Sequence, residues 1–194
     1  MGLLQLGLII FSVLPVLANA LLGYQLLRNG QGILGKPTIS PVLFYLSKSI
    51  TGLAFGLLLA ACAHSRFFEL FPWLIQDNIP EVQKLMALIF MFGGNLLLVP
   101  AYYSLSIFTR VGLPTSPHIL HTEGVFRISR NPMYTSFFFF FPACFLLVPS
   151  ILVALLLIFN LTIHHLIILN EEKFMATEFG EEYLTYKKNT ARYL

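Results

Sequence analysis

Four long stretches of the chain consist almost entirely of apolar residues, and polar residues separate them. They are 3–27, 42–63, 85–108 and 137–169. A hydrocarbon core about 30 Å thick needs roughly 20 apolar residues in a helix, so each of the first three predicts one transmembrane helix. The first stretch has no Lys or Arg before it and stays apolar past a possible cleavage site at 18–20. We therefore interpret it as a retained span and not as a cleaved signal peptide.

The fourth stretch is too long for a single span. A helix over its whole length would extend about 50 Å, well beyond the membrane. Val148-Pro149-Ser150 lies inside it and favours a turn. We therefore predict a hairpin of two antiparallel helices, roughly 134–148 and 150–169. Such a hairpin returns the segment before it (110–134) and the segment after it (170–194) to the same membrane face.

The tail over 171–190 predicts an amphipathic helix that Gly180 interrupts. Its apolar side consists of Phe174, Phe179, Tyr183, Leu184 and Tyr186. Its charged side consists of Glu171, Glu178, Glu181, Lys187 and Lys188. The predicted fold is therefore all-α: a polytopic integral membrane bundle of about five transmembrane helices, followed by a C-terminal amphipathic helix on the cytoplasmic face.

Composition supports the membrane assignment. Of 194 residues, 57% are hydrophobic and 11% are charged, whereas a soluble domain carries about 25% charged residues. The mean hydropathy is +0.77. These values exclude a soluble globule, a disordered tail and a nucleic-acid-coating protein. Cys62 and Cys144 both lie in apolar stretches, so the sequence has neither a disulfide framework nor a zinc-binding spacing.

The placement of Lys and Arg predicts the orientation. The connection after the second span mixes basic with acidic residues, and the turn of the hairpin has no charge. The remaining connections and the tail hold Arg28, Lys36, Arg110, Arg127, Arg130, Lys173, Lys187, Lys188 and Arg192. The positive-inside rule then places the N-terminus outside and both 110–134 and the tail in the cytoplasm. Lys48, near the start of the second span, is expected to extend its ammonium to the nearer interface.

The two halves of the chain differ in content. We expect residues 1–109 to form three transmembrane helices with short loops. Residues 110–194 hold nearly all the polar chemistry and form the predicted catalytic half, with a cytoplasmic cofactor loop, the hairpin at 134–169 and the C-terminal helix.

The densest polar cluster lies over 118–134, beside the membrane. It contains two His, two Arg, a Glu, an Asn and a Tyr, which is more variety than contact with lipid headgroups requires. Gly124 permits a tight turn or a close approach to a ligand, and Pro132 can begin the next helix. His118 and His121 have no third ligand close in sequence, so we expect no metal site.

Two carboxylates, Glu171 and Glu172, follow the last span directly. Acidic groups at a membrane boundary are costly unless paired. Neighbouring side chains on a helix point about 100° apart, so we expect the two to serve different partners. One of these partners is the Arg130 region or a cationic ligand group. Asn95, His164 and His165 lie within spans and are expected to face the bundle interior or a cavity.

Taken together, these motifs resemble the isoprenylcysteine carboxyl methyltransferase family of integral membrane enzymes, particularly its compact five-span archaeal members. The related phospholipid methyltransferases are similar in the C-terminal half. Phe126 and Asn131 stand where the family usually has Tyr and His. The motifs that carry the resemblance are His121, Gly124-Val125-Phe126, Arg130-Asn131-Pro132-Met133-Tyr134, Glu171-Glu172, and Phe179-Gly180-Glu181-Glu182-Tyr183 with Tyr186.

The resemblance implies that the chain binds S-adenosylmethionine and releases S-adenosylhomocysteine. Aromatic residues suit the adenine base, polar residues suit the ribose, and Glu171 suits the ammonium of the methionine part. The implied cofactor contacts are His118, Ile119, Leu120, His121, Gly124, Phe126, Asn131, Pro132, Met133, Tyr134 and Glu171.

The implied reaction is methyl transfer to a lipid-like acceptor, namely the carboxylate of a prenylated cysteine or a similar lipophilic acid. A carboxylate is deprotonated at neutral pH and needs a cation rather than a base. Arg130 is the first candidate for this catalytic cation and Arg127 the second. Glu172, His164 and His165 are further candidates for substrate contact.

Three alternatives remain open. A phospholipid N-methyltransferase would first have to remove a proton from an amine, through His121, His164 or Glu172. A sterol-type reductase has similar motifs, but NADPH requires a denser basic cluster. A membrane scaffold without enzymatic activity is the third. We expect a monomer that contacts membrane lipids, takes its lipophilic substrate from the bilayer and binds no nucleic acid.

Overall fold

The computed structural model describes residues 2–30, 35–63, 79–105 and 119–194 of the chain. Over these residues the protein is all-helical, and each predicted span corresponds to a helix. The predicted all-α membrane bundle is confirmed. The elements are α1 (Leu3–Arg28), α2 (Pro41–Cys62), α3 (Glu81–Leu105), the short 3-10 helix η4 (Gly124–Arg127), α4 (Pro132–Leu147) and α5 (Ile151–Asn189).

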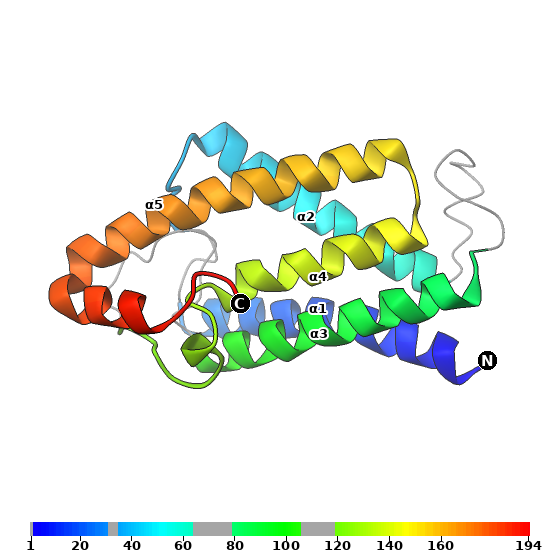
Figure 1. Ribbon diagram of the computed structural model, residues 1–194, viewed down its shortest axis with the longest axis horizontal. Coiled ribbons are helices and arrows are strands. Elements are labelled where there is room, and N and C mark those ends of the chain that lie inside the picture. Colours follow the sequence, from blue (N-terminus) through cyan, green and yellow to red (C-terminus); the bar gives the residue numbers. More distant parts are fainter. Residues whose placement is uncertain (1, 31–34, 64–78, 106–118) are drawn as a thin grey trace.

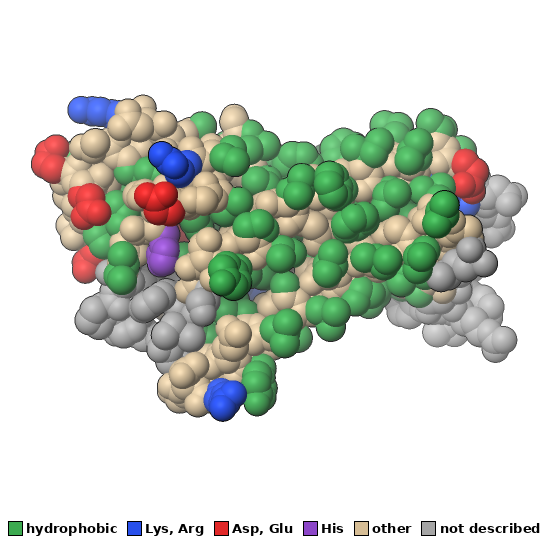
Figure 2. Space-filling view, turned by 90° about the horizontal axis from the view of Figure 1, so that it is seen from below, with side chains coloured by type: hydrophobic (Ala, Val, Ile, Leu, Met, Phe, Trp, Pro, Cys, Tyr) green, Lys and Arg blue, Asp and Glu red, His purple; other side chains and the backbone are tan. Residues whose placement is uncertain are grey.

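Four of these helices, α1, α2, α3 and α5, are long and apolar enough to cross a membrane. The fifth, α4, has 16 residues and is about 24 Å long. The predicted set of about five spans therefore consists of four helices of spanning length and one shorter apolar helix. Figure 2 shows apolar side chains over the middle of the molecule and charged side chains gathered toward its ends, as expected for an integral membrane protein.

The predicted hairpin is present. Helix α4 ends at Leu147 and α5 begins at Ile151, and the backbone N–H of Ser150 donates to the carbonyl of Val148 at 2.8 Å in the turn between them. The two helices run in opposite directions, so the segment before α4 and the far part of α5 lie at the same end of the molecule (Figure 1). This end carries most of the polar residues discussed below.

The last helix differs from the prediction in one respect. We predicted a separate helix over 171–190, whereas α5 continues from the apolar part of the hairpin as far as Asn189. No helix-breaking residue lies near the end of the apolar stretch, so nothing stops the helix there. The predicted interruption is found at Gly180, whose φ of 52° allows a bend that other residues rarely adopt. Beyond it the chain turns back toward α4 (Figure 1).

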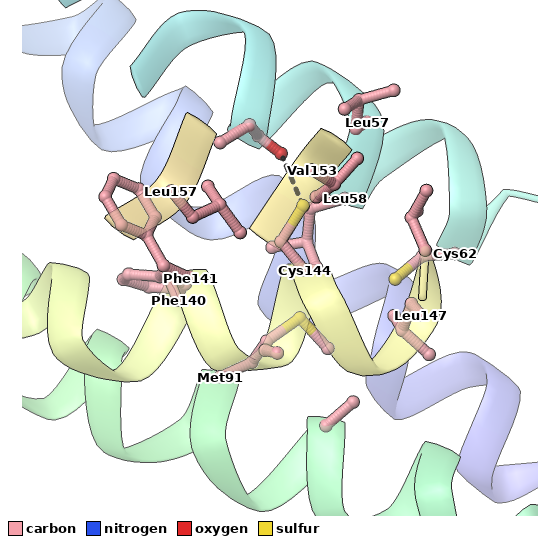
Figure 3. Close-up of a cluster of buried hydrophobic side chains, with 14 of the residues drawn as sticks. Leu57, Leu58, Cys62, Met91, Phe140, Phe141, Cys144, Leu147, Val153 and Leu157 are labelled. Carbon is pink, nitrogen blue, oxygen red and sulfur yellow. Dashed lines mark hydrogen bonds between the residues drawn. The ribbon is translucent and has the colours of Figure 1, made fainter. Parts of the chain in front are cut away.

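The core lies between the helices. Helix α3 packs along both α1 and α4, and α2 contacts α1, α4 and α5. Figure 3 shows part of this core, where Met91, Phe140 and Phe141 meet apolar residues of α2 and α5. The thiol of Cys144 donates to the carbonyl of Ala54 at 3.5 Å.

Helices α3 and α4 approach each other at a pair of glycines. A Cβ added at Gly94 would lie 2.7 Å from the ring of Phe140, which is 1% exposed. The next residue, Asn95, donates from its side-chain amide to the carbonyl of Phe11 at 2.9 Å and so links α3 to α1. As predicted, this intramembrane polar group faces the interior.

The glycine contact predicts that Gly94→Ala destabilises the protein by about 1–3 kcal/mol, because the buried Phe140 ring cannot move aside. The measurement is the thermal unfolding midpoint of the detergent-purified protein, which should fall by several degrees. Gly52→Ala is the matched control, since a Cβ there meets nothing within 4 Å. Equal midpoints for the two variants would contradict the prediction.

Candidate active site

Three segments meet at the polar end of the bundle: the loop that contains η4, the far part of α5 and the C-terminal residues (Figure 1). The C-terminal residues pair with the loop through the backbone, because Arg130 N–H donates to the carbonyl of Ala191 at 2.9 Å. A parallel bridge joins Ser129 to Ala191. The hydroxyl of Ser129 also donates to the carbonyl of Arg192 at 3.2 Å. The last residues of the chain are therefore part of this region.

A buried ion cluster fastens these segments together. Glu172 on α5 accepts from Arg130 and from Arg192, each at 2.9 Å. The side chains of Glu172 and Arg130 are 6% and 7% exposed, and that of Arg192 is 32% exposed. The carboxylate of Glu172 raises the pKa of Arg192, so the guanidinium of Arg192 stays charged at any physiological pH.

Arg130 is committed to partners within the protein. Its Nε and Nη2 donate to Glu172, and its Nη1 donates to the carbonyls of Lys187 and Thr190. Asn131 adds a contact to Glu172 at 3.3 Å. Arg127, the second candidate for the catalytic cation, is exposed. Within the part of the chain that the structure describes, no polar partner is recorded for it.

The neighbouring carboxylate has different surroundings, as the sequence analysis expected. Glu171 accepts from the hydroxyl of Tyr134 at 2.9 Å. It therefore lies inward, although we had placed it with the charged residues on the outer side of the tail helix. Tyr134 stands two residues into α4, so the start of α4 and the middle of α5 are joined at this point.

The two adjacent histidines of α5, His164 and His165, also have different surroundings. His164 is 2% exposed, its Nδ1 lies 2.9 Å from the carbonyl of Asn160, and its ring contacts those of Tyr134 and Phe137. His165 is half-buried, and its Nδ1 lies 2.5 Å from the hydroxyl of Tyr193. His164 therefore belongs to the interior, and His165 belongs to the contact with the C-terminal residues.

The loop before α4 holds the remaining predicted cofactor residues. Gly124 has a φ of 59°, a conformation that suits glycine, and it begins η4. The rings of His121 and Phe126 are 6.1 Å apart, and burial lowers the pKa of His121 from its ordinary value, which favours the neutral imidazole. Ile119 is 65% exposed and Leu120 is 8% exposed. His118 lies outside the described residues.

Next to this region, a cavity of about 430 Å³ lies among the helices. Most of its lining is apolar and comes from α1, α2, α3 and α4. Two predicted cofactor residues, Met133 and Tyr134, line it from α4, and Lys48 lines it from α2. The cavity therefore reaches the predicted cofactor residues directly. Further lining residues include Asn19, Leu22, Thr51, Gly52, Phe55, Gly56, Leu98, Tyr102 and Phe137.

Lys48 is the residue whose position the sequence analysis missed. We expected its ammonium at the interface, but it lies 3.4 Å from His164 Nε2 and 4.9 Å from the centre of the Tyr134 ring. The helical period contained a signal for this placement. Lys48, Gly52 and Gly56 are four residues apart and share one face of α2, and all three line the cavity.

The structure thus brings the predicted residues into three groups. One contains Arg130, Asn131 and Glu172. The second contains Tyr134 and Glu171, with His164 against the Tyr134 ring, and the third contains His121 and Phe126. Pro132 is buried at the first turn of α4 and connects the first group to the second.

The ion cluster predicts that Glu172→Gln loosens the C-terminal residues, because Arg130 would keep its buried charge without a counter-ion. The expected loss is about 3 kcal/mol in the free energy of unfolding. The measurements are the unfolding midpoint and the rate at which carboxypeptidase removes the last residues. Glu178→Gln, on the exposed side of α5, is the control. A Glu172→Gln variant that resists carboxypeptidase as the parent protein does would refute this role.

The comparisons with known proteins bear on this arrangement. The model of a family described as phospholipid methyltransferase matches residues 82–182, slightly more than half of the chain. The match covers nearly all of α3, all of η4 and α4, and α5 beyond both adjacent carboxylates. No curated protein matches the chain.

Proposed function

Because the chain belongs to the phospholipid methyltransferase family, we propose that it transfers a methyl group from S-adenosylmethionine to the carboxylate of a prenylated cysteine or a similar lipophilic acid. Membership of the family makes the protein a membrane methyltransferase and implies S-adenosylmethionine as the methyl donor. The acceptor, the carboxylate chemistry and the residue roles below are our proposal.

The observation that carries the proposal is the cavity between the helices. Its size falls within the usual range for small-molecule sites, about 300–1,000 Å³. A mostly apolar lining suits a lipid chain, which gains nothing from leaving the bilayer for water. Met133 and Tyr134 line the cavity and are also predicted cofactor residues. A lipid in the cavity would therefore lie next to the site where we propose that the methyl donor binds.

The residues around Tyr134 suit the cofactor chemically. The Tyr134 hydroxyl occupies one oxygen of Glu171, and the structure records no partner for the second oxygen in the described residues. That oxygen can accept from the ammonium of the methionine part. In the separate group of the loop, the ring of His121 lies against Phe126 and is our candidate for contact with the adenine, and Asn131 and the loop backbone offer polar groups for the ribose.

In this proposal the protein acts mainly by positioning the lipid carboxylate next to the methyl donor. Bound S-adenosylmethionine would supply an activated methyl group on its sulfonium, which a deprotonated carboxylate would accept. The carboxylate has no proton to lose, so no residue is needed as a general base. The apolar lining excludes water from the reacting groups. Arg130 positions the loop through Glu172, since its three nitrogens already have protein partners.

The orientation follows from the distribution of charge. The end of α1, where Arg28 is the last residue, lies at the same end of the bundle as the loop before α4 and the C-terminal residues (Figure 1). The positive-inside rule supports a cytoplasmic site and C-terminus, with the N-terminus outside. The proposed enzyme is a monomer that takes the cofactor from the cytoplasm and the lipid from the bilayer.

A second candidate function is N-methylation of a phospholipid amine, which the description of the matching family favours. An ammonium headgroup would have to lose a proton before attack. His121, whose neutral form is favoured by burial, would be the acceptor of this proton. Methylation of phosphatidylethanolamine vesicles, tested beside methylation of a lipophilic acid, separates the two functions.

The cofactor assignment predicts that the detergent-purified protein binds S-adenosylhomocysteine and not NADPH in calorimetric titrations. Glu171→Gln should weaken that binding by about tenfold to a hundredfold, because a charge-assisted contact to the ammonium is lost. Glu178→Gln should bind as the parent does. Binding of NADPH alone would favour a reductase, and binding of neither would favour a scaffold. Unchanged affinity in Glu171→Gln would remove Glu171 from the cofactor site.

The cavity assignment predicts that larger side chains at Gly56 exclude the lipid. A Cβ at Gly56 meets nothing within 4 Å, and Gly56 lines the cavity, so the side chain of Gly56→Leu takes up cavity space. Methylation of a farnesylated acid should fall by about tenfold or more, with a smaller loss for Gly56→Ala and unchanged affinity for S-adenosylhomocysteine. Leu53→Phe adds volume on the exposed side of α2 and is the control. Equal activity in Gly56→Leu and Leu53→Phe would mean that the lipid binds elsewhere.

A further inference from the structure

Lys48 places a positive charge at the edge of a mostly apolar cavity. Its Nζ lies 5.2 Å from the centre of the Phe44 ring and 4.9 Å from that of the Tyr134 ring. Such contacts with aromatic faces favour a cation. The side chain lines the cavity and takes part in none of the ion pairs of the described residues, which join Lys84 to Glu81 and two arginines to Glu172.

His164 fixes the direction of this ammonium. The carbonyl of Asn160 can only accept, so His164 Nδ1, at 2.9 Å from it, is the donor. In the neutral imidazole Nε2 is then an acceptor, and it lies 3.4 Å from Lys48 Nζ. An ammonium has three N–H donors. One of them faces His164, and no hydrogen bond joins the other two to the residues that the structure describes.

The other charged groups near the cavity have partners in the protein or are assigned to the cofactor. Glu171 acts on Lys48 electrostatically. The Tyr134 hydroxyl donates to one oxygen of Glu171 at 2.9 Å, and we propose that the second oxygen accepts from the ammonium of the cofactor. Arg130 and Arg192 are paired with Glu172. Of the described cations, Lys48 is thus the one that lines the cavity and retains donors for a ligand there.

We infer that Lys48 binds the carboxylate of a lipophilic acid in the cavity and selects an acid over an amine or a neutral lipid. The inference rests on the proposed function and adds a specificity-determining residue to it. A carboxylate accepts from the free N–H donors and balances the charge, so the pair is stable in apolar surroundings. A protonated amine in the same place would meet a like charge in a medium of low dielectric constant, which is strongly unfavourable.

The placement also suits the proposed reaction. Tyr134 contacts the Lys48 ammonium with its ring and Glu171 with its hydroxyl. The proposed acid site and the proposed cofactor site are therefore joined by a single side chain. An acid held by Lys48 presents its carboxylate beside Tyr134, where the methyl donor is proposed to bind.

The test compares two probes of equal size and different charge, N-acetyl-S-farnesylcysteine and its uncharged carboxamide. Each is titrated into the full-length, detergent-purified protein without cofactor. The parent protein should bind the acid about tenfold to a hundredfold more tightly than the amide. Lys48→Met should bind the two equally, and Lys48→Arg should keep a preference for the acid. Lys84→Met, with the same substitution at the distant start of α3, should behave as the parent.

A Lys48→Met variant that still prefers the acid as the parent does would overturn the inference. So would a variant in which methylation of phosphatidylethanolamine falls while binding of the acid does not, because the anion at Lys48 would then be a phosphate. Amide binding at the parent level reports an intact cavity, and Lys48→Arg provides a second reading should Lys48→Met fail to fold.

The same experiment separates this inference from the proposed function. Failure of the parent protein to bind S-adenosylhomocysteine would refute the methyltransferase mechanism. The ratio of acid to amide binding needs no cofactor, so it decides the role of Lys48 in either case.

Discussion

Burying a carboxylate at the edge of a membrane is costly unless cations neutralise it, and Glu172 meets this requirement with two arginines from different parts of the chain. Arg130 comes from the loop before α4, and Arg192 comes from the segment after α5. Each arginine needs the carboxylate as much as the carboxylate needs them. The cluster therefore joins the loop, the last helix and the C-terminal residues, and it holds the loop that contains the predicted cofactor residues.

The adjacent carboxylate, Glu171, is not part of this ion cluster. Because neighbouring positions on α5 face different directions, Glu172 serves the structure while Glu171 turns to Tyr134 and the cavity. The same division occurs earlier on α5, where the ring of His164 contacts the ammonium of Lys48 and the ring of His165 contacts the hydroxyl of Tyr193. Helix α5 thus directs Glu172 and His165 to the contacts with the C-terminal residues, and Glu171 and His164 to the residues beside the cavity.

Much of this arrangement could be predicted from the sequence because it depends on local signals. The length of the apolar stretches predicted the membrane spans, Val148-Pro149-Ser150 predicted the turn of the hairpin, and Gly180 predicted the interruption of the last helix. The inward turn of Lys48 and the pairing of Arg192 with Glu172 depend instead on which helices become neighbours. The continuation of α5 beyond the apolar stretch was missed for another reason: a change from apolar to polar residues ends a span but does not end a helix.

The shortness of α4 has a consequence for the membrane itself. At about 24 Å the helix is shorter than a hydrocarbon core of about 30 Å, while its neighbours α3 and α5 are long enough to span that core. This hydrophobic mismatch must be relieved by thinning of the bilayer beside α4 or by a local dip of the headgroups toward its ends. Tyr134, two residues into α4, lies near one end of this short helix. The thickness of the surrounding bilayer, which depends on its lipids, therefore affects the surroundings of the candidate active site at this end of α4.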